Sequence, residues 1–227
     1  MKFAYILVEG ATELEFVRSV LKPHFVDLGM QMQGIQVITR RVGGDAAHRG
    51  GHVRYEQFQR QIRKLLQNTQ ATLVSTMFDY YGLGADFPLP VKTQTGRAVD
   101  RVLALEKSVE QDVNDPRFRA YFALHEFEAM LFVDPDVVAR VTQSIAARSE
   151  LMAIANNFAT PEDINDHPST APSKRLANCI ANYDKTFHGP YVTMEIGLAK
   201  LRQGCPHFGQ WLNMMETIVT QPDKPKG

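Results

Sequence analysis

Apolar and polar residues alternate in blocks along the first half of the chain, and each block has the spacing of one kind of secondary structure. Runs that are apolar almost throughout, typical of strands buried on both faces, occupy residues 3–8, 35–39, 71–78 and 118–124. Apolar residues recur at the 3.6-residue spacing of a helix over residues 12–22, 53–66 and 96–113. Strands that alternate with helices predict an α/β fold in which helices flank a mostly parallel sheet.

The second half of the chain has no further strand pattern and contains two helix starts. Asp134-Pro135 and Thr160-Pro161 each place a capping residue before a proline, which is a common beginning of a helix. We therefore expect an α/β core over residues 1–133, a helical extension packed on it over residues 134–220, and a disordered tail over residues 221–227.

The first helix carries a signal at each end. Thr12 and Glu15 have the spacing of a capping box, in which the two side chains satisfy backbone N–H groups at the start of a helix. Pro23 has no backbone N–H to donate, so we expect the helix to end just before it.

Composition narrows the class of protein. The chain has 227 residues, 44% of them apolar, with 25 basic and 25 acidic residues, which suits one compact unit and argues against nonspecific coating of polyanions. The two cysteines, Cys179 and Cys205, are too few for a disulfide framework and are expected to be buried thiols. The first apolar run is too short for a signal peptide, and no stretch of about 18 apolar residues follows, so we expect a cytoplasmic location.

Acidic residues follow three of the predicted strands. Glu9, Asp79 and Glu126 each lie at or just past a strand's carboxyl end, and such ends meet at one edge of a parallel sheet, where ligands of α/β proteins bind. Glu13 and Glu128 follow closely enough to face the same edge. Because unpaired carboxylates repel one another, the cluster favours a divalent cation, and oxygen ligands favour Mg²⁺ or Mn²⁺. Phosphodiester hydrolysis is a common reaction at such sites.

Each acid taken alone has a simpler interpretation. Acidic residues after strands are common helix caps, and Glu128 at the start of a helix would also complement the helix dipole. The coincidence of three strand ends is what favours the metal cluster over these structural roles.

A second group of residues suggests phosphate binding. Glycine-rich residues 39–53 contain neither the P-loop nor the dinucleotide-binding pattern, so we expect no nucleotide cofactor of those two classes. The cationic side chains here are candidates for contacts with nucleic-acid phosphates, or else belong to a flexible solvated loop: Arg40, Arg41, His48, Arg49 and His52. His188 and His207 are expected to be structural, and Phe208 and Trp211 to be core residues.

The acidic motifs resemble those of the Toprim superfamily, the metal-binding α/β domain of topoisomerases, primases and OLD (overcoming lysogenization defect) nucleases. Val8-Glu9-Gly10-Ala11-Thr12-Glu13 is similar to the Toprim glutamate motif in its OLD-like form, and Asp79 to the first acid of the Asp-x-Asp motif. Tyr81 occupies the position of the second acid, which puts the usual metal arrangement in doubt, and Glu126 or Glu128 is a candidate to replace it.

The whole chain resembles a small Toprim-like family that is often encoded beside an AAA or ABC-type ATPase in defence or mobile-element neighbourhoods. The segments that carry this resemblance are 8–13, 78–83, 124–132, 164–175 and 205–211. The resemblance to OLD-type nucleases also implies a lysine after the acids, a role that Lys174 would fill by stabilising the transition state. A surface position in the first turn of a helix is an equally good interpretation of Lys174.

The sequence thus supports a first hypothesis and two rivals. In the first, the chain is a Toprim-fold, Mg²⁺- or Mn²⁺-dependent nuclease of DNA or RNA, with a partner ATPase and a role in phage defence. Glu9, Asp79 and Glu126 would be catalytic, and Tyr80 and Tyr81 would stack on bases. In the second, the chain is a non-enzymatic scaffold of an ATPase complex, and in the third a phosphohydrolase acting on nucleotides. Whether the chain forms a homo-oligomer stays open.

Overall fold

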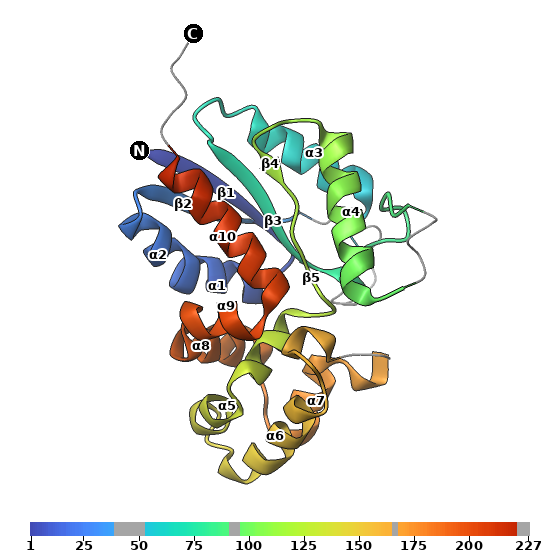
Figure 1. Ribbon diagram of the computed structural model, residues 1–227, viewed down its shortest axis with the longest axis vertical. Coiled ribbons are helices and arrows are strands. Elements are labelled where there is room, and N and C mark those ends of the chain that lie inside the picture. The colour runs from blue at the N-terminus through green and yellow to red at the C-terminus, as the bar shows by residue number, and fades with distance from the viewer. Residues whose placement is uncertain (39–52, 91–95, 165–167, 222–227) are drawn as a thin grey trace, which may run out of the picture.

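The computed structural model describes residues 1–38, 53–90, 96–164 and 168–221, and it places a parallel sheet at the centre of the chain (Figure 1). The strand order is β2-β1-β3-β4, with β5 also paired to β3, and every pairing among the described strands is parallel. The strands are β1 (Lys2–Val8), β2 (Met30–Gln36), β3 (Leu73–Asp79), β4 (Phe118–Arg119) and β5 (Phe122–Ala123). The predicted α/β fold class is confirmed.

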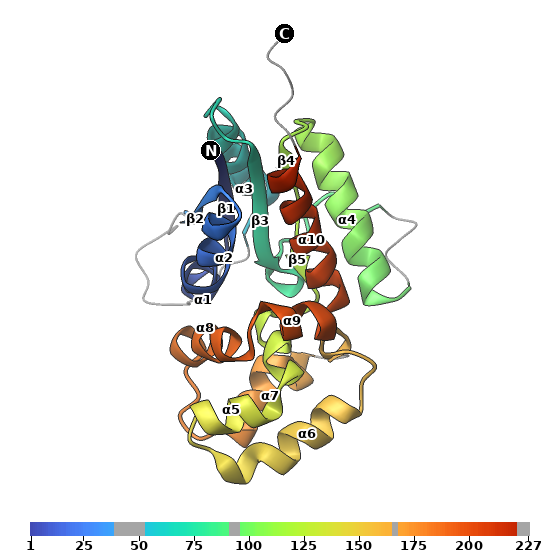
Figure 2. The ribbon, with the colours of Figure 1, turned by 60° about the vertical axis from the view of Figure 1, so that its left-hand side comes forward.

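Helices cover both faces of this sheet. One face is covered by α3 (Tyr55–Leu66) and α4 (Ala98–Val113), whose apolar side chains share a core with Phe78 and Phe122 of the sheet. The other face is covered by α1 (Ala11–Phe16), the π-helical turn η1 (Val17–Leu21), α2 (Lys22–Asp27) and α10 (Pro206–Thr220) (Figure 2).

The remaining helices form a region beyond the carboxyl edge of the sheet (Figures 1 and 2). In chain order this region comprises η4 (Phe127–Val133), α5 (Pro135–Val141), η5 (Ile145–Ala147), α6 (Arg148–Asn156), η6 (Pro161–Asp163), η7 (Pro168–Thr170), α7 (Pro172–Cys179), α8 (Lys185–Ile196) and α9 (Leu198–Gly204). The 3₁₀ turn η2 (Tyr80–Gly82) lies between this region and β3.

The last helix belongs spatially to the sheet. Trp211 is buried in α10 and donates a hydrogen bond from Nε1 to Oγ of Ser75 in β3 at 2.9 Å. At the far end of the helix, Lys2 Nζ donates to the carbonyl oxygens of Ile218 at 2.6 Å and Val219 at 2.8 Å. Phe208 and Trp211 are core residues as predicted. The predicted boundary between core and helical extension at residue 133 stays a prediction. The structure shows in addition that α10 packs on the α/β core.

The second strand differs from its predicted position, residues 35–39. It covers Met30–Gln36 and forms the edge of the described sheet, where its only partner is β1. Met30 and Met32 are buried against α1 and α2, whereas Gln33 is exposed. The strand therefore has the period-two pattern of an edge, which a search for continuous apolar runs misses.

The first helix also differs from prediction at both ends. Gly10, not Thr12, caps it, and its N–H donates to Oε2 of Glu13 at 2.9 Å, while Glu15 instead lies 3.7 Å from Arg18 in an ion pair. Helical structure continues through Pro23 to Asp27. The π-helical turn that ends two residues before Pro23 widens the backbone, which explains how a residue without an N–H is accommodated in the first turn of α2.

The predicted strand 118–124 is split into β4 and β5 by side-chain hydrogen bonds. Oγ1 of Thr76 donates to the carbonyl of Tyr121 at 3.0 Å and accepts from its N–H at 2.9 Å, so it replaces a backbone partner. On the outer side of the strand, Glu110 accepts the N–H of Ala120 and Glu106 that of Phe122. Two carboxylates of α4 thus close what would otherwise be an open sheet edge.

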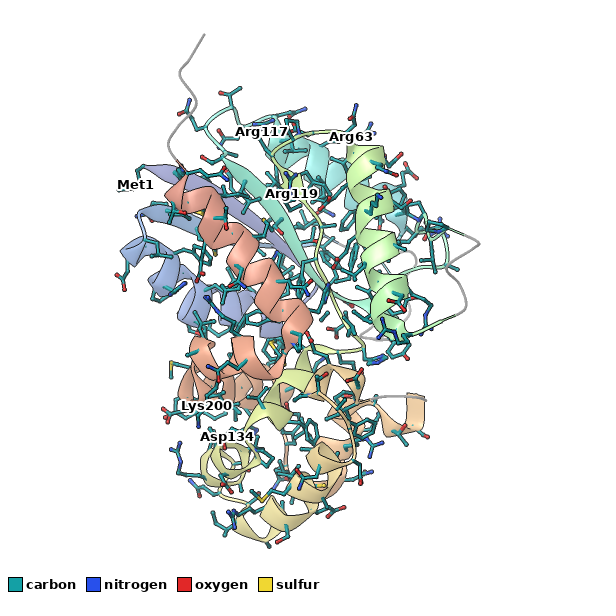
Figure 3. The ribbon with its side chains drawn as sticks, viewed as in Figure 1. Met1, Arg63, Arg117, Arg119, Asp134 and Lys200 are labelled. Carbon is teal, nitrogen blue, oxygen red and sulfur yellow. The ribbon has the colours of Figure 1, made fainter. Side chains whose placement is uncertain are left out.

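The helix starts in the second half behave differently from each other. Asp134 caps α5 as predicted, accepting the N–H of Val137 at 3.1 Å, and Lys200 donates to its other oxygen at 2.7 Å (Figure 3). Thr160-Pro161 begins only the 3₁₀ turn η6. Within this turn, buried Glu162 accepts the N–H groups of His207 and Phe208 at the start of α10, a tertiary contact that no local pattern reveals.

The remaining expectations concern single residues and the chain as a whole. His207 is buried, stacks on Tyr121 and lies 3.1 Å from Glu106, so its role here is structural. Both cysteines are free thiols, and Cys205 is buried whereas Cys179 is partly exposed. In the part of the chain that the structure describes, no helix combines the length and apolar composition needed to span a membrane. The predicted tail lies outside the described residues except for Gln221.

Candidate acidic site

The carboxyl ends of β1, β3 and β5 meet at the edge of the sheet that faces the helical region (Figures 1 and 2). Hydrogen bonds join the acids at this edge to the backbone. The N–H of Asp79 donates to Oε2 of Glu9 at 3.3 Å, and the N–H of Phe127 donates to Oδ1 of Asp79 at 2.8 Å. The two strand ends and the start of η4 are therefore held together through carboxylates.

The turn after β3 closes against Glu9. A Cβ atom added at Gly82 would lie 2.6 Å from both carboxylate oxygens of Glu9, closer than any real contact of this kind. Glycine at this position lets η2 approach the carboxylate without a clash.

Glu126 is positioned by an unusual backbone conformation and by α7. His125, directly before it, is buried and has a left-handed φ of 67°, which turns the chain from β5 into η4. Oε2 of Glu126 then accepts the N–H of Ser173 in the first turn of α7 at 2.9 Å. The helical region thus contacts the acids directly.

Two further acids of the cluster are almost fully buried. Glu13 in the first turn of α1 is 6% exposed, and Glu128 in η4 is 2% exposed. Within the described part of the chain, Oε1 of Glu128 has no hydrogen-bond partner. A buried carboxylate oxygen without a partner is costly, so a proton or a cation bound at this oxygen would stabilise the fold.

The pKa of Asp79 shows that the other four predicted acids all act on this residue. Burial raises this pKa well above its ordinary value of 3.8, and the negative charges of Glu13, Glu128, Glu9 and Glu126 raise it further. Side chains from three strand ends and two helical turns therefore form one electrostatic cluster, which we call the acidic cluster.

The other buried acids respond in the same direction. Burial raises the pKa of Glu128 to about 7; nearby Lys185 opposes this rise and Glu126 adds to it. Burial also raises the pKa of Glu13. Without a cation, the acidic cluster holds protons near neutral pH that ordinary carboxyl groups would have lost.

Sequence reasoning missed Lys185, the lysine that faces this cluster. It lies at the start of α8, a helix that packs against α1. Partial burial of its amine lowers its pKa, but Glu128, Glu13 and Asp79 raise it more, so the net pKa is above its ordinary value of 10.5. The structure gives Lys185 no ion pair within 4.0 Å among the described residues, so its interaction with the acids acts through space.

Lys174, the lysine implied by the Toprim resemblance, is placed differently. It is exposed on α7, and the structure gives it no hydrogen bond or ion pair with a described residue. The contact between α7 and the acidic cluster comes from the backbone N–H of Ser173 instead.

Aromatic residues border the acidic cluster. Tyr81 is 42% exposed, and its ring stacks on His125 with the ring centres 5.1 Å apart. Tyr80 and Tyr81 line a pocket of about 400 Å³ that Phe87 and Leu105 complete. The ring of Tyr81 thus lies beside His125 at the border of the acidic cluster.

Sequence reasoning also missed Tyr183. Its hydroxyl is buried and has no hydrogen-bond partner among the described residues. Burial raises the pKa of this hydroxyl, and the charges of Glu128, Asp184 and Glu126 raise it further, so the group is a neutral donor beside the acids. No local pattern distinguishes Tyr183 or Lys185, because Lys185 at the start of α8 and Tyr183 just before it reach the site only through tertiary packing.

Two expectations remain without structural support. The five cationic residues of the predicted phosphate-binding loop, Arg40, Arg41, His48, Arg49 and His52, lie outside the described residues. Among the residues that are described, no three acidic, histidine or cysteine side chains already stand together as a ready metal site. The acidic cluster has oxygen donors of the kind that Mg²⁺ and Mn²⁺ prefer, but these side chains would have to move to surround an ion.

Comparison with known proteins places the chain in a family defined by one domain. A family model described as a domain of unknown function, DUF4276, matches residues 8–216, and the chain belongs to this family. No curated protein matches the chain. No solved structure matches it either. The matched region includes the entire acidic cluster.

Proposed function

We propose that the chain is a divalent-metal-dependent nuclease with a Toprim-like site, which hydrolyses phosphodiester bonds of DNA or RNA with Mg²⁺ or Mn²⁺. The observation that carries this proposal is the acidic cluster itself. The charges of four carboxylates at the sheet edge raise the pKa of the fifth, Asp79, and within the described part of the chain Glu128 has a buried oxygen without a partner. Among the described residues, the single positive charge of Lys185 does not balance the carboxylates, and a divalent cation would neutralise the remaining negative charge.

The positions of the five acids suggest which role each would have in metal binding and catalysis. Glu9 and Asp79 would hold the ion, and Glu126 would complete its shell or act as the base. Glu13 and Glu128 would support a second ion or orient the first three acids. When bound, the metal would supply a Lewis acid and lower the pKa of an attacking water.

Residues outside the carboxylates would handle the substrate. We assign to Lys185, rather than Lys174, the task of stabilising negative charge that develops on the phosphate, since Lys185 interacts with the acids. The exposed ring of Tyr81 offers a stacking surface for a base. An ATPase partner, a role in phage defence and a cytoplasmic location belong to the same proposal and rest on the resemblance.

Metal binding is the first property to test, because an inactive nuclease can simply lack its partner. Binding at a concentration one hundred times the Kd would stabilise the folded chain by about 2.7 kcal/mol, which raises the Tm of a chain of this size by roughly 5–10 °C. We expect Mn²⁺ to give this rise in the wild type but not in the Glu9→Gln variant. Glu15→Gln, which removes an exposed acid from the same helix, is the matched control.

Cleavage assays then test the reaction. Labelled single-stranded DNA, double-stranded DNA and RNA would be incubated with Mn²⁺, with and without the neighbouring ATPase. We expect Glu9→Gln and Asp79→Asn to abolish cleavage, and Lys185→Ala to lower kcat by about 10²-fold or more while Lys174→Ala leaves it unchanged. Full cleavage by Glu9→Gln would disprove the proposal.

A non-enzymatic scaffold is the second candidate, because Tyr81 replaces an acid and the described residues contain no ready metal site. This candidate predicts no effect of Mn²⁺ on the Tm of either the wild type or Glu9→Gln, and no cleavage with the ATPase present. Such a result, with both proteins folded, would replace the nuclease proposal.

A further inference from the structure

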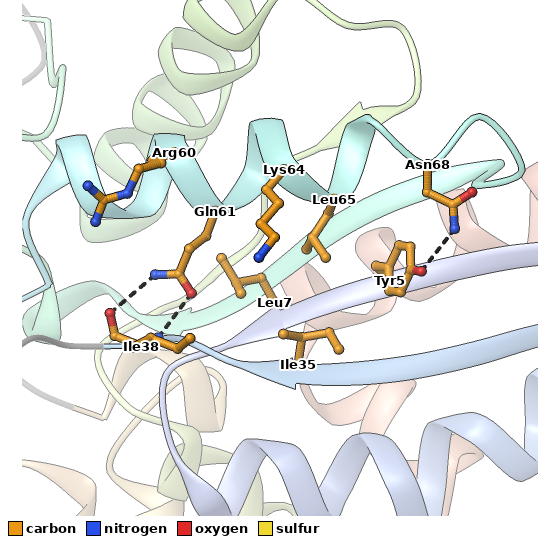
Figure 4. A pocket seen from close by; sticks show the side chains of 9 residues that line it. All are labelled: Tyr5, Leu7, Ile35, Ile38, Arg60, Gln61, Lys64, Leu65 and Asn68. Carbon is orange, nitrogen blue, oxygen red and sulfur yellow. Dashed lines mark hydrogen bonds between the residues drawn. The ribbon is translucent and has the colours of Figure 1, made fainter.

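A second cavity lies on the opposite side of the molecule from α10, between α3 and the edge of the sheet. It has a volume of about 580 Å³, within the usual range of small-molecule sites. The residues that line it come from β1, from β2 and the residues just after it, and from α3 and its carboxyl end (Figure 4): Tyr5, Leu7, Ile35, Ile38, Arg60, Gln61, Lys64, Leu65 and Asn68.

The cavity exists because α3 lies over β1 and β3 and leaves the β2 edge of this sheet face open. Leu7 forms a fully buried floor, whereas Ile35 and Leu65 are only partly buried and Ile38 is 74% exposed. The apolar surface is therefore contiguous and incompletely covered by the described chain, which is a common property of binding sites.

Hydrogen bonds between helix and sheet limit the cavity at both ends. At one end, the Gln61 side chain accepts the N–H of Ile38 at 3.0 Å and donates to its carbonyl at 3.4 Å. At the other end, Nδ2 of Asn68 donates to the hydroxyl of Tyr5 at 2.9 Å (Figure 4). The seven residue steps from Gln61 to Asn68 span about 10 Å at 1.5 Å per step, so the cavity is too short for a docked helix, which is itself about 10 Å wide.

The charged side chains at the opening of the cavity indicate the sign of the charge that a ligand would carry. Arg60 and Lys64 are one helical turn apart on α3, and both are exposed. Neither has an ion-pair partner within 4.0 Å among the described residues. Among the described residues, none that lines the cavity is acidic. An apolar chamber with two unpaired cations at its opening fits a molecule with an apolar body and one anionic end.

We propose that this cavity binds a medium-chain fatty-acid anion. Its alkyl chain lies over Leu7 and Ile35 beneath Leu65, and its carboxylate pairs with Lys64 and Arg60. This proposal is independent of the acidic cluster, because none of the five cluster acids lines the cavity.

Calorimetric titration with decanoate below its micellar concentration tests the proposal. We expect saturable binding with one ligand per chain, at least tenfold tighter than decanol and absent for decyltrimethylammonium. Lys64→Glu should weaken binding of decanoate at least tenfold. Arg63→Glu, the same change one residue earlier on the same helix but outside the cavity lining, should leave it unchanged. Because both sites are exposed, both variants are expected to fold.

Three results would overturn the proposal. They are the absence of saturable binding, equal affinity for decanoate and decanol, and equal affinity in the wild type and Lys64→Glu. Chain length gives a further check, since the closed ends predict that hexadecanoate binds no more tightly than decanoate. Affinity that keeps increasing with chain length would mean nonspecific adsorption and would also reject the site.

Discussion

Glu128 makes the metal-free chain less stable as the pH rises. Its pKa is raised from 4.5 to about 7, chiefly by burial, so the folded chain binds a proton more tightly there than the unfolded chain does. At about 1.4 kcal/mol for each pH unit, ionising the buried group costs on the order of 3 kcal/mol. The stability that protonation provides is complete below pH 4.5 and is lost as the pH rises to about 7.

Replacing Glu128 by glutamine tests this reasoning. The amide has nearly the same shape and no charge, so Glu128→Gln should be more stable than the wild type at pH 7.5 in EDTA, by up to 3 kcal/mol or about 6–12 °C in Tm. Urea unfolding between pH 4.5 and 8 should give a flatter profile for the variant. Added Mn²⁺ should narrow the difference by stabilising the wild type more.

The exposed acid Glu15 supplies the control for this measurement. Glu15→Gln removes a carboxylate from the surface of α1, and we expect its stability profile to follow that of the wild type. If Glu128→Gln were less stable than the wild type at pH 7.5, or lost stability with pH just as steeply, the assignment of a buried, repelled carboxylate would be wrong.

Three further predictions concern other parts of the fold. Burial lowers the pKa of His207, but the contact with Glu106 raises it more, so the net pKa is above 6.5. The pair therefore stabilises the chain fully below pH 6.5, and this contribution is lost as the pH rises through the pKa of His207 in the folded chain. Glu106→Gln should remove this stabilisation at low pH, measured by urea unfolding. Trp211→Phe loses the hydrogen bond to Ser75 and should lower the free energy of unfolding by about 1–3 kcal/mol, measured by calorimetry. An equal loss in a Ser75→Ala background would refute the energetic coupling of the two side chains. Gly82→Ala should abolish the Mn²⁺-dependent rise in Tm while the protein stays folded, and an unchanged rise would show that the close approach to the carboxylate is not needed.

The sequence was sufficient to predict most of the α/β core because its signals are local. The runs at β1 and β3 are buried on both faces, so apolar content alone marks them, and an acid at each strand end marks the carboxyl edge. Strand β2 was misplaced because an edge strand alternates Met with Gln instead of forming a continuous apolar run. Pro23 was misread as a helix end because a π-helical turn is not visible in apolar spacing.

The residues of the candidate site likewise fall into those that local sequence signals indicate and those that only tertiary packing brings to the site. The five acids were found because each lies within a few residues of a strand end. Lys185 and Tyr183 were not, because they enter the site from the start of α8 and the residues just before it, and the position of α8 depends on contacts with α1 that form only in the folded chain. Lys174 was chosen by resemblance, and it lies next to the backbone N–H that meets Glu126 without reaching the acids itself.

The return of α10 to the sheet has a consequence for how the helical region is attached. Because the chain leaves the sheet after β5 and rejoins it at α10, the helices between them are an insertion anchored at two points (Figure 1). Lys2 fastens the end of α10 to the start of β1, so both ends of the described chain lie at the amino edge of the sheet, opposite the acids. A tag or tether attached near either end of the described chain would therefore start at the edge of the sheet opposite the acidic cluster.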